Sequence, residues 1–181
     1  MFVTNRLKIF EKETCRNTIS AVTLKNAYNC RHDSLHEGEM DTWELDSDSL
    51  SISTSPWAQK YPDVVTVVIE DGVTTIGSFA YNSCSNLTKV DLPESITSIE
   101  GRAFQSTGIL TITIPNSVEH IGWEAFERCE ALTNITIPSS VQDMSNLFCG
   151  CCSLENIDVE INNSSYMSVD GVLYDKDKKV L

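Results

Sequence analysis

The sequence predicts a repeat solenoid, mainly β, in which parallel strands stack one per coil and are joined by turns or short helical return segments. The main observation is a six-residue phrase with apolar residues at its first, fourth and sixth positions. The phrase begins at residues 64, 87, 109, 132 and 154, so its steps are 22 or 23 residues. A fixed period of this size is typical of a solenoid in which every repeat forms one coil.

Each phrase reads as a strand with one buried face. Its last residues alternate between apolar and polar, which is the period of such a strand. A proline follows three of the phrases, at Pro93, Pro115 and Pro138, and Glu70 takes that place in the first repeat. Because proline lacks an N–H group, it cannot continue a ladder, and we expect each strand to end there.

Four further slots recur between the phrases, and their residues agree in size and polarity. They hold a branched aliphatic residue, an isoleucine or methionine, an Ala-Phe pair or a variant of it, and a small residue. In order along the chain they are Val73, Ile96, Val118 and Val141; Ile76, Ile99, Ile121 and Met144; Ala80-Tyr81, Ala103-Phe104, Ala125-Phe126 and Leu147-Phe148; and Cys84, Thr107, Cys129 and Cys151. We expect each slot to form a column through the stacked coils, which makes the repeat of the leucine-rich type.

Two stretches, 121–132 and 132–141, together with the shortened link Thr107-Gly108-Ile109, resemble the BspA-like leucine-rich repeats. The resemblance covers roughly residues 40–181. The sequence departs from the family pattern at 78–81, and at 144–147, where one residue is missing. The resemblance implies a leucine-rich repeat surface protein with 22–23-residue repeats, because members of this family are largely surface and adhesion proteins of bacteria and some protists.

The pattern divides the chain into four parts. Residues 1–41 form a poorly defined flank, and 42–62 are expected to form a capping hairpin with a short connection. Residues 63–160 are the solenoid, and 161–181 read as a C-terminal hairpin that resembles the one between repeat blocks in the family. We expect the chain to be truncated within that hairpin.

The charge of the chain restricts its partners. The net charge is −13, from 13 basic and 26 acidic residues. Phosphate backbones and anionic membranes both attract clustered Lys and Arg, so we expect no nucleic acid and no membrane docking. No apolar stretch is long enough to insert into a membrane, and residues 1–10 lack the features of a secretory signal. The chain is therefore expected to stay inside the cell if it is complete, or else to be a mature or truncated piece.

The residue types that usually carry chemistry do not form a known site. The seven cysteines are an odd number, and Cys149, Cys151 and Cys152 lack the second pair of ligands that a zinc site needs. His32 and His36 read as part of an exposed loop, and His120 as an exposed turn residue. There is no phosphate-binding loop, dinucleotide motif or nucleophile elbow. We therefore expect no catalytic residue, no metal and no cofactor.

What remains is the surface of the stacked strands, here called the inner wall. By strand alternation, the polar positions of every phrase point away from the core, and solenoids bind partners on such extended surfaces. The residues of the inner wall are Thr66, Val68, Lys89, Asp91, Thr111, Thr113, Asn134, Thr136, Asn156 and Asp158.

The favoured interpretation is a non-catalytic protein-binding or adhesion module, extracellular or at the cell surface, with a protein or host-surface ligand. Two alternatives stay open: a structural spacer that displays another domain, and an intracellular interaction scaffold. The open ends of the solenoid also predict self-association through edge strands.

Overall fold

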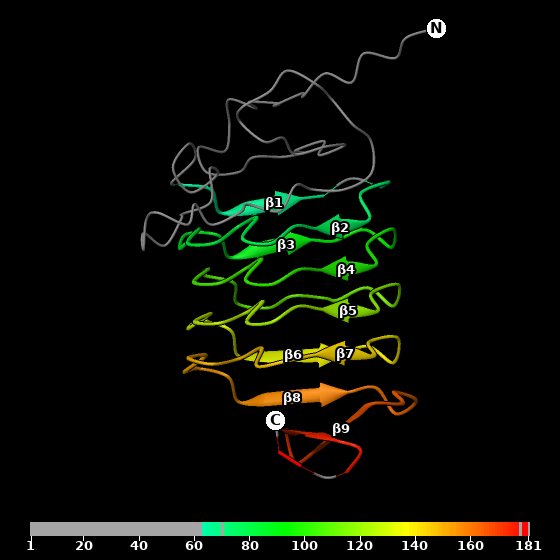
Figure 1. The fold of residues 1–181 in the computed structure, drawn as a ribbon. Coiled ribbons are helices and arrows are strands. Elements are labelled where there is room, and N and C mark those ends of the chain that lie inside the picture. Colours follow the sequence, from blue (N-terminus) through cyan, green and yellow to red (C-terminus); the bar gives the residue numbers. More distant parts are fainter. Residues whose placement is uncertain (1–62, 70, 178, 181) are drawn as a thin grey trace, which may run out of the picture.

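The computed structural model describes residues 63–69, 71–177 and 179–180. The flank and the capping hairpin expected within residues 1–62 lie outside these ranges. The described residues form ten strands and no helix, and the coils follow one another along a single axis (Figure 1). No helix in this part of the chain could therefore span a membrane.

The phrases form the first parallel wall. β1 (Thr66–Val68) pairs with β3 (Lys89–Asp91), and β6 (Asn134–Ile137) pairs with β8 (Asn156–Val159). Every residue lies opposite its equivalent one repeat along the chain. This register confirms the prediction of stacked parallel coils.

The third phrase, 109–114, departs from the expected strand. Ile109, Ile112 and Ile114 are buried as predicted, but the segment joins no ladder. Within this segment, only Leu110 makes backbone hydrogen bonds to the neighbouring coils. Its N–H donates to Thr88 O and its carbonyl accepts from Thr133 N, both at 3.3 Å. The apolar pattern encodes burial, which is retained. It does not encode the distance between backbones, on which the ladder depends.

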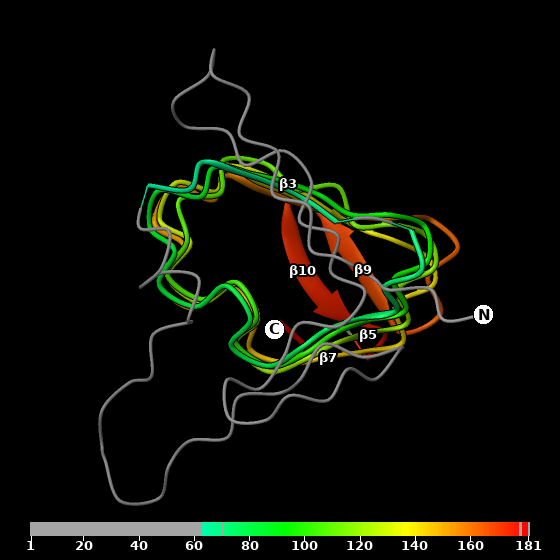
Figure 2. The ribbon, with the colours of Figure 1, turned by 90° about the horizontal axis from the view of Figure 1, so that it is seen from above.

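A second parallel sheet lies on the opposite side of each coil, where the pattern predicted no strand (Figure 2). It contains β2 (Thr75–Ile76), β4 (Ser98–Ile99), β5 (His120–Ile121) and β7 (Asp143–Met144), in that spatial order. In each strand the second residue is the buried Ile or Met of its column. A two-residue strand is too short to show alternation in the sequence, so the sequence pattern predicts the buried column but not the strand.

Turns close each coil, and no helical return segment occurs among the described residues. We call this third side the turn wall; it comprises residues 77–84, 100–107, 122–129 and 145–151. Phe79, Arg102 and Glu124 share one slot there and have φ of 56° to 59°, in the left-handed region. This geometry lets alternate N–H groups reach the next coil, as from Tyr81 N to Ala103 O at 2.8 Å.

Gly122 shows how closely the coils approach in the turn wall. A Cβ atom at this position would lie 2.4 Å from Gly101 N and 2.7 Å from Glu100 C. No side chain fits there without a backbone shift, so this position requires glycine.

The core consists of the predicted columns. All the column residues from Val73 to Leu147 are buried. The apolar residues of the phrases are buried too, except Leu92 and those of the last phrase, which are partly buried. The aromatic column stacks face to face. Its ring centroids are 5.5 Å apart from Tyr81 to Phe104, 5.6 Å from Phe104 to Phe126 and 6.2 Å from Phe126 to Phe148.

An antiparallel hairpin lies at the C-terminal end, where it packs against β8. It consists of β9 (Tyr166–Val169) and β10 (Val172–Asp175). Asp170 and Gly171 both have positive φ, 50° and 78°, as a two-residue turn of this kind requires. The buried Asn163 holds the segment that leads into this hairpin against the preceding coil. Its Nδ2 donates to Pro138 O and Val141 O, and its Oδ1 accepts from the N–H groups of Ser165 and Tyr166.

Candidate interaction surface

The inner wall is the first candidate surface, and the structure turns its side chains away from the core. Lys89, Thr111, Thr113, Asn134, Thr136 and Asp158 are exposed, while Thr66, Val68, Asp91 and Asn156 are half-buried. The strand register places Thr66 opposite Lys89, and Thr136 opposite Asp158. The ten residues therefore lie in two parallel rows, one side chain of each row per coil.

Most of the polar bonds of the inner wall are short-range and exposed. Lys89 Nζ lies 2.9 Å from Asp91 Oδ2, and Asn156 Nδ2 donates to Asp158 Oδ2 at 2.7 Å. Each pair joins residues within one coil. Exposed pairs of this kind contribute about 0–1 kcal/mol, so they add little to stacking and are easily rearranged by a partner.

Side chains that could ligate a metal are the next candidate among the described residues. No group of three or more His, Cys, Asp or Glu side chains within them could hold a metal ion. His120 Nδ1 lies 3.1 Å from Asp143 Oδ2, but these side chains are 40% and 75% exposed. His32 and His36 lie outside the described residues.

The cysteine slot has a structural role that the sequence suggested only as small-residue packing. Cys129 Sγ donates to Phe104 O at 3.1 Å, and Cys151 Sγ donates to Phe126 O at 3.1 Å. Thr107, which fills the slot in the shortened repeat, donates to Phe104 O at 2.9 Å. Burial raises the pKa of Cys129 above its usual value and that of Cys151 to about 12. These two sulfurs are therefore protonated hydrogen-bond donors at neutral pH.

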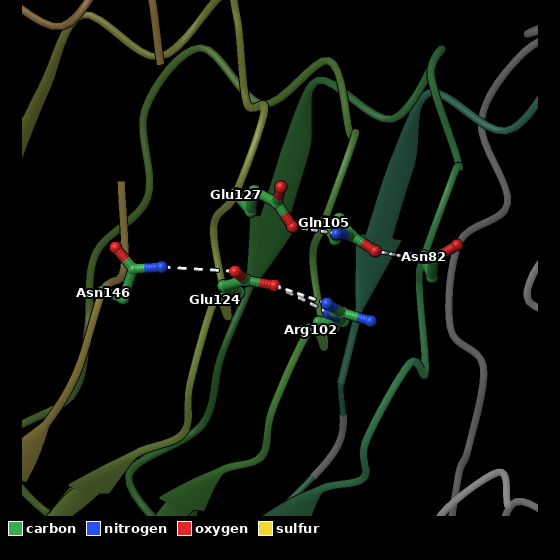
Figure 3. Close-up of polar contacts among 6 residues, drawn as sticks. All are labelled: Asn82, Arg102, Gln105, Glu124, Glu127 and Asn146. Carbon is green, nitrogen blue, oxygen red and sulfur yellow. Dashed lines mark hydrogen bonds and ion pairs between the residues drawn. The ribbon is translucent and has the colours of Figure 1, made fainter. Parts of the chain in front are cut away.

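Two polar ladders in the turn wall were not anticipated from the sequence (Figure 3). In the first, Arg102 Nε donates to Glu124 Oε2 at 2.8 Å, and Asn146 Nδ2 donates to Glu124 Oε1 at 3.2 Å. In the second, Asn82 donates to Gln105, which in turn donates to Glu127. Both run across successive coils.

Their residues are separated by 22 or 23 positions, so they share slots as the apolar columns do. This spacing was the signal that could have found them. The sequence alone does not predict the ladders, because polar residues in a turn are expected to be solvated, whereas Asn82 and Glu124 are buried.

Trp123 adds an aromatic surface beside these ladders. It is 49% exposed, and Arg102 Cζ lies 4.3 Å from the centroid of its ring and 5.7 Å from that of Phe79. The guanidinium group thus lies between rings from the first and third coils. Trp and Arg are enriched at the energetic centres of protein interfaces, which makes this a second candidate surface.

The comparisons with known proteins agree with this architecture. The family model described as BspA type leucine rich repeat region matches residues 51–169, with six copies. None of the curated proteins matches the chain in sequence. A solved leucine-rich repeat protein from Eubacterium ventriosum is 26% identical, with a TM-score of 0.56, over 77% of this chain and 42% of that one.

Two further solved structures are similar. The pneumococcal vaccine antigen PcpA is 24% identical, with a TM-score of 0.53, over 78% of this chain and 40% of that one. A leucine rich cell surface protein from Faecalibacterium prausnitzii is 33% identical, with a TM-score of 0.44, over 63% of this chain and 24% of that one. The chain spans less than half the length of each of these structures. Since the family model covers well over half of the sequence, the chain belongs to the BspA-type leucine-rich repeat family.

Proposed function

We propose that this chain is a non-catalytic protein-binding or adhesion module of a cell-surface or secreted leucine-rich repeat protein, and that its partner lies on the inner wall. Family membership supports an interaction module, because repeat solenoids present extended surfaces to other proteins. The surface and adhesion role is what the resemblance to BspA-like proteins implies.

The observation that carries the proposal is the regular exposure of the inner wall. Threonine and asparagine side chains project from successive coils without a role in the core, as at Thr111, Thr113, Asn134 and Thr136. Paired strands of neighbouring coils lie about 4.8 Å apart, so a partner that runs along the wall would meet exposed side chains, most of them polar, at regular steps. Short polar side chains also lose little rotamer entropy when a partner fixes them.

The test is a pull-down in which the whole 181-residue chain is the bait and cell-surface and extracellular-matrix extracts supply the partner. The binding variant carries Thr113→Arg and Thr136→Arg, which place two long cations in the centre of the inner wall. The matched control carries Thr97→Arg and Gln142→Arg, also exposed neutral residues, beside the second sheet.

A protein captured by the wild type and by the control, but not by the inner-wall variant, would support the proposal. Capture that survives both inner-wall substitutions would remove the inner wall as the binding surface. No captured protein at micromolar concentration would favour a spacer that holds another domain, and capture only from cytosolic extract would favour an intracellular scaffold.

A further inference from the structure

One face of the C-terminal hairpin is turned away from the solenoid. Val169 lies opposite Val172, and Met167 lies opposite Tyr174, so these four side chains project from the same side of the two strands. Every residue of β9 and β10 on that side is therefore apolar or aromatic. Tyr174 also bridges to Val180, which adds one more apolar residue. We call these five residues the end face.

The opposite side of the hairpin packs against the preceding coils and fixes the direction of the end face. Tyr166 and Leu173 are buried there, and the Tyr166 hydroxyl donates to Met144 O and accepts from Met144 N. Ser168 Oγ accepts from Val159 N. Seen along the axis, the hairpin lies across the end of the coils (Figure 2). The end face therefore points along the axis, away from the coils.

The exposed apolar residues of the end face lie together. Val169, Val172 and Val180 are 47%, 41% and 60% exposed. They are three of the six large hydrophobic residues that are exposed in the described part of the chain; the others are Leu110, Trp123 and Ile161. Single exposed apolar residues are ordinary on a protein surface, whereas a contiguous group marks a contact surface.

The charge around the end face favours a second copy of this chain as the partner. The net charge of −13 makes two copies repel each other over most of their surface. Residues 166–181, in contrast, contain three Asp and three Lys and are neutral as a group. The turn of the hairpin holds Asp170, whereas residues 175–179 at its open end contain two Asp and three Lys. Each end of the hairpin is therefore complementary in charge to the other end.

We propose that this chain forms a reversible two-fold dimer in which two end faces pack against each other with their hairpins antiparallel. A two-fold contact uses the same patch on both copies, so the apolar residues of each copy are covered by those of the other. In the antiparallel arrangement, Asp170 of each copy lies over the open end of the other hairpin, which carries Lys176 and Lys179. In a parallel arrangement the two Asp170 carboxylates would meet and repel each other.

The size of the end face sets the expected affinity. It has five residues, whereas a standard interface has about 20–30 on each side, so we expect a Kd of about 10–100 µM. The end face lies at the end of the solenoid and the inner wall lies along its side (Figure 1). The dimer therefore leaves the inner wall accessible, and the failure of either proposal leaves the other unaffected.

The experiment is sedimentation equilibrium of the whole 181-residue chain at concentrations on both sides of that Kd. A reducing agent is present so that the exposed thiols of Cys149 and Cys152 do not link copies. The main variant carries Val169→Thr and Val172→Thr. Threonine keeps the β-branched shape that strands favour, so the hairpin should fold normally, and circular dichroism checks this. Leu110→Thr is the matched control, since Leu110 is 51% exposed and lies outside the hairpin.

We expect the wild type and Leu110→Thr to dimerise with the same Kd. The double valine variant should raise Kd by about tenfold or more, because apolar area on both copies is no longer buried. Absence of association, an unchanged Kd in the valine variant or an equal rise in Leu110→Thr would each overturn the proposal. Association beyond a dimer would also overturn it, because a two-fold contact closes.

Asp170→Asn tests the relative direction of the two hairpins. Asparagine tolerates the positive φ of Asp170, so the variant removes the charge and keeps the turn. Kd should rise by about threefold, because the attraction between Asp170 and the opposite open end is lost twice per dimer. A fall in Kd would show that the two carboxylates repel each other in the dimer, and would overturn the antiparallel arrangement.

Discussion

The inner wall and the turn wall share one sequence period, yet they use their polar residues in opposite ways. Polar pairs of the inner wall such as Lys89 and Asp91 are exposed and lie within one coil. Asn82, Arg102 and Glu124 of the turn wall are buried or largely buried and bond to the next coil. Repetition alone therefore does not reveal the role of a polar column. Its burial decides whether the column holds the coils together or is available to a partner.

The largest effect should come from the tightest contact of the turn wall. Gly122→Ala should lower the free energy of unfolding by about 3 kcal/mol or more, because its Cβ would overlap the backbone of Gly101 and Glu100. Urea denaturation measures this change. Gly101→Ala is the control; there the Cβ would lie 3.2 Å from Trp123 O, so a loss of only about 1 kcal/mol is expected. Equal losses in the two variants would contradict the close approach at Gly122.

The next largest effect should come from the buried carboxylate. Glu124→Ala leaves Arg102 and Asn146 without their acceptor, and we expect a loss of about 2 kcal/mol in the free energy of unfolding. Asp158→Ala removes an exposed carboxylate of the inner wall and should change the free energy of unfolding by less than about 0.5 kcal/mol. The same denaturation experiment compares the two. Similar losses would mean that both walls contribute to stacking.

A smaller effect should appear at alkaline pH, because the described part of the turn wall contains buried thiols at Cys84 and Cys129 and a half-buried one at Cys151. The folded state raises the pKa of Cys151 from its ordinary value of 9.0 to about 12, because burial disfavours the thiolate. The folded chain therefore retains this proton at pH values where the unfolded chain has lost it. The stability that results is fully present below pH 9 and is lost as the pH rises towards 12.

Cys151→Thr should make the decline of stability above pH 9 shallower, since it replaces the thiol with the residue that fills this slot at Thr107. Thermal unfolding over a range of pH measures the slope. Cys152→Thr changes an exposed thiol and serves as the control. An identical slope in Cys151→Thr and the wild type would show that ionisation of this thiol does not contribute.

The smallest effect should come from the inner wall itself. Thr113→Arg with Thr136→Arg should leave the free energy of unfolding within about 0.5 kcal/mol of the wild type, because both side chains are exposed and outside the core. Chemical denaturation tests this, and the result also validates the pull-down. A loss well above that value would mean that these threonines stabilise the coils rather than serve a partner.

The C-terminal hairpin shows how far local sequence can predict geometry. The sequence predicts a strand over 169–174, a polar turn at 175–178 and a return strand at 180–181. The structure instead turns at Asp170 and Gly171, which have positive φ, and pairs β9 with β10. The predicted return appears only as one antiparallel bridge between Tyr174 and Val180. An Asp-Gly pair is a strong local signal for a two-residue turn, so Asp170 and Gly171 carried the information that this reading did not use. The anchoring of the hairpin by Asn163 reaches back to Pro138 and Val141, and no local pattern encodes it.

The sequence by itself determined the period, the columns and the parallel stacking, because burial of Ile, Val and aromatic residues every 22 or 23 positions leaves few other solutions. Only the tertiary structure decided the second sheet, the interrupted ladder at 109–114 and the polar ladders of the turn wall. It alone brought Phe79, Arg102 and Trp123 together from three different coils. These features depend on the distances between neighbouring backbones and on the orientation of individual side chains. A repeat pattern along the sequence contains neither.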